Sequence, residues 1–314
     1  MWLFKKDPQF EFMGKRRLAF VVSLVLLSIA IGAIAVRGLN LGIDFTGGTV
    51  VEAGYEQAVD LGEVRGALEA GGFDDAIVQH FGSAREVMIR LASEEGVEAA
   101  ELSNQVISAL REHDPTVDLR RVEFVGPQVG EELTQDGMLA MLYALGGILV
   151  YVAFRFEYRF AAGSVAALVH DITLIVGILA LFQVSFDLTV LAALLAVIGY
   201  SLNDTIVVFD RIRENFIVMR KGTTEEVMNA SINQTLSRTI ITSFTTLLVV
   251  MSLYLLGGEL ISGFALTLLL GVLVGTYSSI YVASSSALAL GVSKFDLQPP
   301  EKEGAEAAEE VGRP

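Results

Sequence analysis

Six long apolar segments constrain this chain more than any other feature of its sequence. Five are close to the roughly 20 residues that a helix needs to cross the hydrocarbon core of a bilayer, and the sixth is longer than needed and is expected to end near the serines at 284–286. Charged residues make up only 19% of the 314 residues, below the roughly 25% of an ordinary soluble domain. The sequence therefore predicts a polytopic α-helical membrane protein. Its six transmembrane helices are expected at residues 18–36, 138–154, 160–182, 188–209, 240–256 and 260–290.

The positions of Lys and Arg predict how these helices are oriented, because short cytoplasmic loops are rich in both. The loops at 183–187 and 257–259 contain neither residue. We therefore expect both termini in the cytoplasm. An Ala33-Ile34-Ala35 sequence also fits a signal-peptide cleavage site, but the long apolar run favours an uncleaved helix. The basic residues of the predicted cytoplasmic side are Lys5, Lys6, Lys15, Arg16, Arg17, Arg155, Arg159, Arg211, Arg213, Arg220 and Lys221.

Residues 37–134 separate the first two spans and are predicted to form an exported, periplasmic domain. They hold seven Lys and Arg against 19 Asp and Glu. Their pattern predicts the order βαββαβ, an α+β ferredoxin-like domain, and this fold alone indicates no function. The strands are expected at 49–55, 76–81, 86–91 and 119–125, and the helices at 61–70 and 97–112. The remaining regions are a cytoplasmic N-terminus (1–17), a five-helix transmembrane region (135–290) and a disordered cytoplasmic tail (291–314).

Composition argues against several kinds of function. The absence of cysteine excludes disulfides and any metal, redox or nucleophilic site built on cysteine. A net charge of −15 argues against nucleic acid as a partner. His80 and His113 are isolated, so we expect surface histidines there. We expect no metal, no cofactor and no hydrolytic activity.

Asp204 is the most unusual residue, because it interrupts an apolar span together with Asn203. An aspartate at the centre of a transmembrane helix costs roughly 2.5–3.5 kcal/mol on insertion scales, so such residues are usually functional. Asp204 should lie about 8 Å from Phe209 along the helix, in its cytoplasmic half. Tyr200 and Ser201 precede it by four and three residues, which places both on its face of the helix.

The next span carries a polar stripe that suggests a partner for Asp204. Gln234, Arg238, Thr242 and Thr245 recur at helical spacing among Ile, Leu, Phe and Val. Arg238 should lie at about the depth of Asp204, and we expect the two to pair, although an ordinary cytoplasmic arginine is the alternative. Desolvation and a nearby opposite charge act in opposite directions on the protonation of a carboxylate. A pair of this kind suits a proton-coupled device.

Three further patterns in the sequence suggest specific roles. His170 and Asp171 lie in the middle of the third span. Asp171 is a second candidate for a proton relay, and a structural hydrogen bond explains His170 at least as well. A capping-box sequence at 223–226 predicts a short interfacial helix. The segment from Gln298 has no apolar face to bury and is expected to be disordered.

Five segments together resemble the SecD/SecF family of bacterial protein-export membrane proteins, which are relatives of the resistance–nodulation–division transporters. They are LGIDFTGGT (41–49), FVGPQVGEEL (124–133), YRFAAGSVAALVHD (158–171), GYSLNDTIVVFDRIREN (199–215) and NQTLSRTIITSFTTL (233–247). In that family the aspartate of SLNDT and the arginine of QTLxRT are implicated in proton movement. They match Asp204 and Arg238 here.

The resemblance implies a subunit of the bacterial inner membrane that pairs with SecD, often with YajC, and joins the SecYEG channel and sometimes YidC. Proton flow would pull preproteins outward after SecA has pushed them in. Two alternatives remain open. One is half of a proton-driven small-molecule or lipid exporter of the same superfamily. The other is a scaffold whose buried charges only fix the register of the helices.

Overall fold

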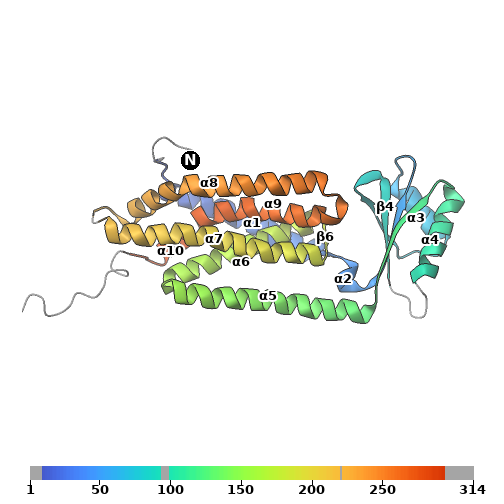
Figure 1. Cartoon of the computed structure of the whole chain (residues 1–314), viewed down its shortest axis with the longest axis horizontal. Helices are drawn as coiled ribbons and strands as arrows, with labels where there is room; N and C mark the ends of the chain where they lie inside the picture. Colours follow the sequence, from blue (N-terminus) through green and yellow to red (C-terminus); the bar gives the residue numbers. More distant parts are fainter. Residues whose placement is uncertain (1–8, 93–98, 220, 294–314) are drawn as a thin grey trace, which may run out of the picture.

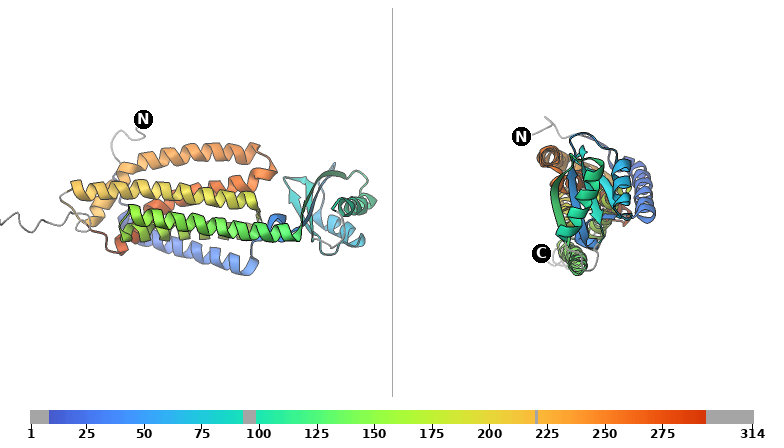
Figure 2. Two further views of the ribbon diagram at one scale, coloured as in Figure 1. Left: turned by 60° about the horizontal axis from the view of Figure 1, so that its bottom comes forward. Right: turned by 90° about the vertical axis from the view of Figure 1, so that its right-hand side faces the viewer.

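The computed structural model describes residues 9–92, 99–219 and 221–293. It consists of a bundle of long helices with a small domain built on a β-sheet at one end (Figure 1). The left view of Figure 2 shows the same end-to-end arrangement, and the right view looks onto the sheet domain along the long axis. Lys5, Lys6, Arg220 and the tail expected to be disordered from Gln298 lie outside the described residues.

Within the described residues, six helical segments are long and apolar enough to cross a membrane, which confirms the expected number. The first five are α1 (Arg16–Arg37), α5 (Pro127–Arg155), α6 (Tyr158–Phe182), α7 (Leu188–Val218) and α8 (Thr224–Leu256). The sixth is composite, with a 3₁₀ turn η2 (Glu259–Ile261), α9 (Ser262–Ser278), a π-helical turn η3 (Ser279–Ala283) and α10 (Ser284–Ala289).

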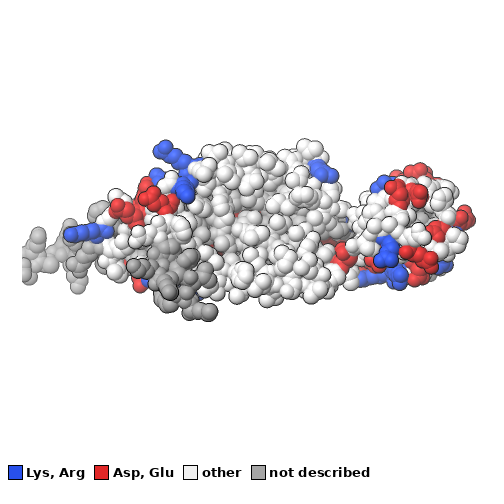
Figure 3. All heavy atoms as spheres, turned by 90° about the horizontal axis from the view of Figure 1, so that it is seen from above, with Lys and Arg blue, Asp and Glu red and all other residues white. Residues whose placement is uncertain are grey.

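The surface of the bundle fits a membrane environment. On the face shown in Figure 3, acidic and basic side chains gather at the two ends of the molecule and are nearly absent from the band between them. The interior is apolar, with Phe160, Phe209 and Ile212 fully buried in one cluster. The most apolar windows of α6 and α7 are half buried, whereas less than a fifth of the corresponding window is buried in α1, α5 and α8. Their outer faces are therefore open to lipid or to a partner.

The helices extend beyond the apolar windows from which they were predicted. Helix α5 begins at Pro127, inside the segment assigned to the exported domain. The capping box is present, since Glu226 N donates to Thr223 Oγ1 over 3.3 Å and Thr223 N donates to Glu226 Oε2 over 2.8 Å. It opens α8 itself, so the predicted separate interfacial helix is wrong. No glycine or proline lies between Thr224 and Leu256 to interrupt that helix.

The sheet domain, residues 48–125, packs two helices on one face of a four-stranded sheet. The strands lie in the order β3-β4-β2-β5 with antiparallel neighbours. The helices lie on the side away from the bundle (Figure 1), where Val51, Leu68 and Ile89 form the core. The elements are β2 (Gly48–Gly54), α3 (Leu61–Ala70), β3 (Ile77–Phe81), β4 (Ser83–Leu91), α4 (Ala99–His113) and β5 (Asp118–Val125).

A compact junction joins α1 to the sheet domain. Strand β1 (Asn40–Leu41) pairs in parallel with β6 (Ser185–Phe186), which connects α6 to α7. A single-turn helix, α2 (Ile43–Thr46), follows β1. Gly47 and Gly48 then turn the chain into β2 with φ of +67° and +121°, which L side chains rarely adopt. A Cβ atom at Gly48 would lie 2.4 Å from the carbonyl oxygen of Leu91, so only glycine fits there.

Candidate functional site

Asp204 lies in the interior of the bundle, where three helices meet. Asp204 belongs to α7, and only 8% of the residue is exposed. Its Oδ1 atom accepts a hydrogen bond from Thr239 Oγ1 of α8 over 2.8 Å. Its Oδ2 atom accepts one from Ser279 Oγ, the first residue of the π-helical turn, over 2.5 Å. Hydroxyl groups therefore satisfy both carboxylate oxygens and join α7 to two other spans.

Arg238 does not form the predicted ion pair with Asp204, although it lies near enough for its charge to act on that carboxylate. Its residue is exposed on α8, and no ion pair joins it to Asp204 in the part of the chain that the structure describes. The predicted stripe lies on the outer face of α8, where Gln234, Arg238, Thr242 and Thr245 are all exposed. Asn203 is also exposed, on α7.

The buried polar face of α8 is shifted by one residue from the predicted stripe. It is formed by Ser231, Thr235, Thr239 and Ser243, again four residues apart. The predicted and observed faces differ because hydroxyl residues occur at helical spacing on both faces of α8. The sequence pattern alone could not distinguish the face that packs inward from the one that points outward.

Asp171 forms a second buried polar centre on α6, with 1% of the residue exposed. Its Oδ2 atom accepts from Ser201 Oγ of α7 over 2.5 Å, and its Oδ1 atom lies 2.8 Å from His170 Nδ1. His170 Nε2 lies 3.2 Å from Ser23 Oγ of α1, which lies 2.9 Å from the hydroxyl of Tyr277. A continuous hydrogen-bonded chain therefore crosses four spans.

One turn of α7, from Ser201 to Asp204, connects the two carboxylates. Ser201, which binds Asp171, precedes Asp204 by three residues, and side chains at this spacing are neighbours on a helix. The predicted supporting residue Tyr200 lies beside them and donates to Ser243 of α8 over 3.3 Å. Ser243 in turn lies 2.7 Å from Thr276 of α9. Of the supporting residues, Ser201 and Tyr200 join this interior network. Gln234 instead accepts from Asn215 over 2.9 Å, and Thr242 bonds to the backbone of its own helix.

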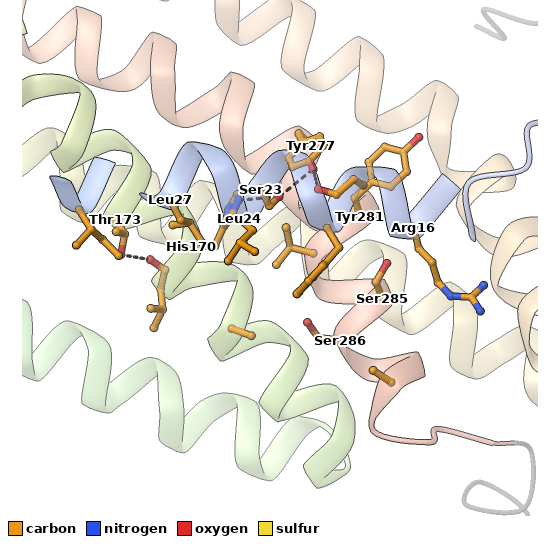
Figure 4. Close-up of a pocket in the computed structure, with 17 residues that line it drawn as sticks. Arg16, Ser23, Leu24, Leu27, His170, Thr173, Tyr277, Tyr281, Ser285 and Ser286 are labelled. Carbon is orange, nitrogen blue, oxygen red and sulfur yellow. Dashed lines mark hydrogen bonds between the residues drawn. The ribbon is translucent and has the colours of Figure 1, made fainter. Parts of the chain in front are cut away.

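A cavity of about 550 Å³ lies where α1, α6 and the sixth span meet. Figure 4 shows Ser23, His170 and Tyr277 on its wall, with Arg16 at one end. Most of its lining is apolar, including Leu24 and Leu27. The hydrogen-bonded chain from Asp171 thus ends at the wall of an apolar pocket that opens on the outer side of α1, where Phe20 and Leu24 are exposed.

Sequence reasoning missed Thr239, Ser279, Ser23 and Tyr277. The signals were modest but visible, since Thr239 belongs to a run of hydroxyl residues at intervals of four and Ser279 lies in a serine pair within an apolar span. The π-helical turn at Ser279 was not predictable from the pattern, although such turns are frequent at functional sites. Among the described residues there is no group of three metal-ligating side chains. The chemistry that the site itself offers is the binding of protons by two carboxylates.

These features define a polytopic membrane protein with acidic residues buried between its spans, and comparison with known proteins supplies the family. The model of the SecD/SecF protein-export membrane protein C-terminal region matches residues 105–293, and the SecD/SecF GG motif matches residues 32–59. The chain belongs to the SecD/SecF family.

Relatives are similar over nearly their whole length. The protein translocase subunit SecF of Vibrio alginolyticus is 55% identical over 97% of this chain and 98% of its own. The subunit of the same name from Escherichia coli O157:H7 is 50% identical over 95% of this chain and 93% of its own.

Two solved structures of SecDF are also similar to this chain. That of Thermus thermophilus, described as a translocon-associated membrane protein, has a TM-score of 0.83 and 40% identity over 92% of this chain. A SecDF in a super-membrane-facing form has a TM-score of 0.68 and 38% identity over 99% of it. This chain spans only 39% and 41% of those longer chains.

Proposed function

We propose that this chain is a SecF-type subunit of the bacterial protein translocase. With SecD, it uses the proton gradient to promote late stages of Sec-dependent preprotein export across the inner membrane. It works without hydrolytic activity of its own. Family membership and the names of its relatives support the role in export. The observation that carries the proton coupling is the pair of buried carboxylates, each bound by hydroxyl groups from other spans.

A buried carboxylate can convert proton binding into movement of helices. Isolated charge is costly in an apolar interior, whereas a protonated carboxyl group is neutral. Protonation also turns one acceptor oxygen of Asp204 into a donor, so Thr239 and Ser279 would need to reorient. Because these partners lie on α8 and the sixth span, gain and loss of the proton would change how those spans pack on α7. Asp171 would extend the proton route through Ser201.

The exposed polar face of the bundle supports SecD as the partner. This face is formed by Asn203, Gln234, Arg238, Thr242 and Thr245. An arginine facing lipid is expensive, so we propose that membrane helices of SecD cover this face and bring an acceptor to Arg238. Arg238 would then act in the relay from the subunit boundary. YajC, SecYEG, YidC and, indirectly, SecA and the preprotein complete the proposed set of partners.

We further propose that both termini are cytoplasmic and that the sheet domain is ferredoxin-like and lies on the periplasmic side. The distribution of basic residues supports this orientation. The loops at the sheet-domain end of the bundle, 183–187 and 257–259, contain no Lys or Arg. Arg155, Arg211 and Arg213 lie at the opposite end, where α5 and α7 finish.

The decisive experiment replaces Asp204 by Asn in the complex with SecD. We expect Asp204→Asn to abolish proton-dependent export and proton flux in reconstituted vesicles while assembly with SecD is retained. Asp210→Asn is the matched control, because Asp210 lies on the same helix but is a surface residue paired with Arg155 at 2.6 Å. Wild-type flux in Asp204→Asn would reject the proposal and leave the buried charges a purely structural role.

A further inference from the structure

Arg90 links the sheet domain to the end of the bundle. It lies on β4, and it points away from the core of the sheet domain because its neighbours Ile89 and Leu91 face inward. Its Nη1 atom donates to the carbonyl oxygen of Leu41 over 2.5 Å and to Asn40 Oδ1 over 3.3 Å. Its Nη2 atom donates to Ser185 Oγ over 3.2 Å. One side chain of the sheet domain therefore binds both strands of the β1–β6 pair.

The β1–β6 pair is the point at which movement of the spans would reach the sheet domain. Asn40 lies three residues after the end of α1, and Ser185 lies between α6 and α7, the helices that carry Asp171 and Asp204. The pair is well tied together, because Gly42 N donates to the carbonyl oxygen of Phe186 over 2.7 Å. Asn40 Nδ2 also donates to the carbonyl oxygen of Gln183 over 3.0 Å. Arg90 is thus fixed to a stiff structure at the ends of three spans.

The rest of this interface is open and of mixed polarity. A cleft of about 480 Å³ separates the sheet from the loop between α8 and α9. Charged side chains on its wall are Glu52, Glu86, Arg120, Arg121 and Glu259. Beside it, a Cβ atom at Gly82 would lie 2.5 Å from Glu259 Cγ, so the two segments touch. Domains move relative to one another unless their interface is large and apolar, and this one is not.

Arg90 itself is held by neutral acceptors. Among the described residues it forms no ion pair, and its Nε atom is buried without a hydrogen-bond partner. Burial lowers the pKa of Arg90. When the sheet domain docks, the guanidinium of Arg90 exchanges hydrogen bonds to water for hydrogen bonds to a few neutral acceptors. This exchange is reversible, because water can replace those acceptors when the domain moves away.

We propose that Arg90 is a positioning residue that pins the sheet domain to the β1–β6 pair in a docked state, and that export requires its release. The requirement for release rests on the proposed function. The docking role of Arg90 does not, since docking can be measured without export. Movement of α1, α6 and α7 on proton binding would shift Asn40 and Ser185 and so free the guanidinium.

Docking can be tested with an engineered disulfide, because the natural chain has no cysteine. In a Gly82→Cys/Glu259→Cys variant the two Cβ atoms would fall near the 3.5–4.5 Å that a disulfide requires. We would measure the rate of disulfide formation in the complex with SecD. Relative to the parent, we expect a several-fold slower rate with Arg90→Gln and also with Arg90→Lys, which cannot reproduce the planar fork of donors. Arg85→Gln, an exposed arginine of the same strand, should not change it.

A second variant removes the two side-chain acceptors, keeps the carbonyl oxygen of Leu41, and leaves the sheet domain unchanged. Asn40→Ala/Ser185→Ala should also slow disulfide formation, though less than Arg90→Gln does, which guards against simple misfolding of the sheet domain. Equal rates in Arg90→Gln, Asn40→Ala/Ser185→Ala and Arg85→Gln would overturn the docking role.

The requirement for release is tested with the same disulfide. The reduced variant, which carries any strain of a cysteine at the positive φ of Gly82, serves as the reference. We expect oxidation to abolish export and dithiothreitol to restore it. Undiminished export by the oxidised protein would overturn the requirement for release, whatever the result with Asp204→Asn.

Discussion

Each buried carboxylate of the bundle depends on hydroxyl groups supplied by a different helix. Thr239 and Ser279 bind Asp204, and Ser201 binds Asp171. A hydroxyl can donate to a charged carboxylate and accept from a protonated one. Threonine and serine therefore stay bonded in both protonation states, which a fixed cation such as arginine cannot do. At the scale of residues, the candidate site consists of two acids and the hydroxyl groups that can bind them in either protonation state.

Two threonines of α8 provide a matched test of this role. Thr239→Val should remove the hydrogen bond to Asp204, reduce proton flux severalfold and cost about 1.5–3 kcal/mol in stability, the range for a bond to a charged group. Thr242→Val should leave flux close to wild type, because Thr242 is exposed and bonds only to carbonyl oxygens of α8. Flux measurements in vesicles and thermal unfolding of the purified variants would check both. Equal flux in the two variants would contradict the assignment.

The acids of the site could be predicted from the sequence, but their donors could not. Asp204 and Asp171 are conspicuous because an acid in an apolar span is costly. Serine and threonine are common in spans and usually bond to their own backbone, as Thr245 does here to the carbonyl oxygen of Ile241. Only the packing shows that Thr239 faces inward and Arg238 outward, one residue apart. The predicted relay role of Asp204, Arg238 and Asp171 remains a prediction.

At the scale of elements, close helix crossings determine how the spans fit together. Helix α1 crosses α6 where Ala30 meets Gly177. A Cβ atom at Gly177 would lie 2.2 Å from Ala30 Cβ and 2.5 Å from its Cα atom, so the backbones themselves are in contact. Small residues allow this approach in membranes, where packing replaces the hydrophobic effect. The crossing holds Ser23 of α1 within reach of His170 of α6.

Gly177→Ala should therefore separate α1 from α6. We expect a loss of about 1–3 kcal/mol, typical of overpacking a tight site, and a weaker contact between Ser23 and His170. Gly32→Ala is the control on α1, because no atom lies within 4 Å of a Cβ placed there. Thermal unfolding in detergent would compare the two variants. A Gly177→Ala protein as stable as Gly32→Ala would show that the crossing tolerates a side chain.

The existence of the spans and strands was easier to predict than their ends. Hydropathy located all six spans, because the bilayer requires about 20 apolar residues whatever the fold. It could not locate their ends, since polar residues continue a helix into water without penalty. Helix α8 thus starts 16 residues before the predicted span at Ile240. In the sheet domain the predicted strands agree with the observed ones to within a few residues, because alternating burial leaves a clear pattern.

On the scale of the whole molecule, the exposed polar face of α7 and α8 supports the proposed contact with SecD. That face carries Arg238 and Asn203 within membrane-spanning helices. The face of the molecule that Figure 3 shows has few charges between its two ends. A protein partner satisfies such groups better than lipid does.

Cysteine labelling can test whether SecD covers this face. Thr242→Cys should react readily with a small maleimide in the isolated subunit and at least tenfold more slowly in the complex. Phe182→Cys, at the end of α6 and 72% exposed, provides a control away from the exposed polar face and should react alike in both. Mass spectrometry would follow the modification. Full reactivity of Thr242→Cys in the complex would place SecD elsewhere.

The π-helical turn has a consequence for how the sixth span can move. A π turn contains one residue more than the α-helical ladder needs, and Ser279–Ala283 holds that surplus beside Asp204. This extra residue interrupts an otherwise regular helix. The π turn can move along the helix when neighbouring residues exchange their backbone hydrogen bonds one at a time. Movement of the π turn would rotate the side chains that it passes about the helix axis by about 100°, the angle between successive helical residues. The span would not unwind. Ser279 could then leave Asp204 while both ends of the helix stay where they are.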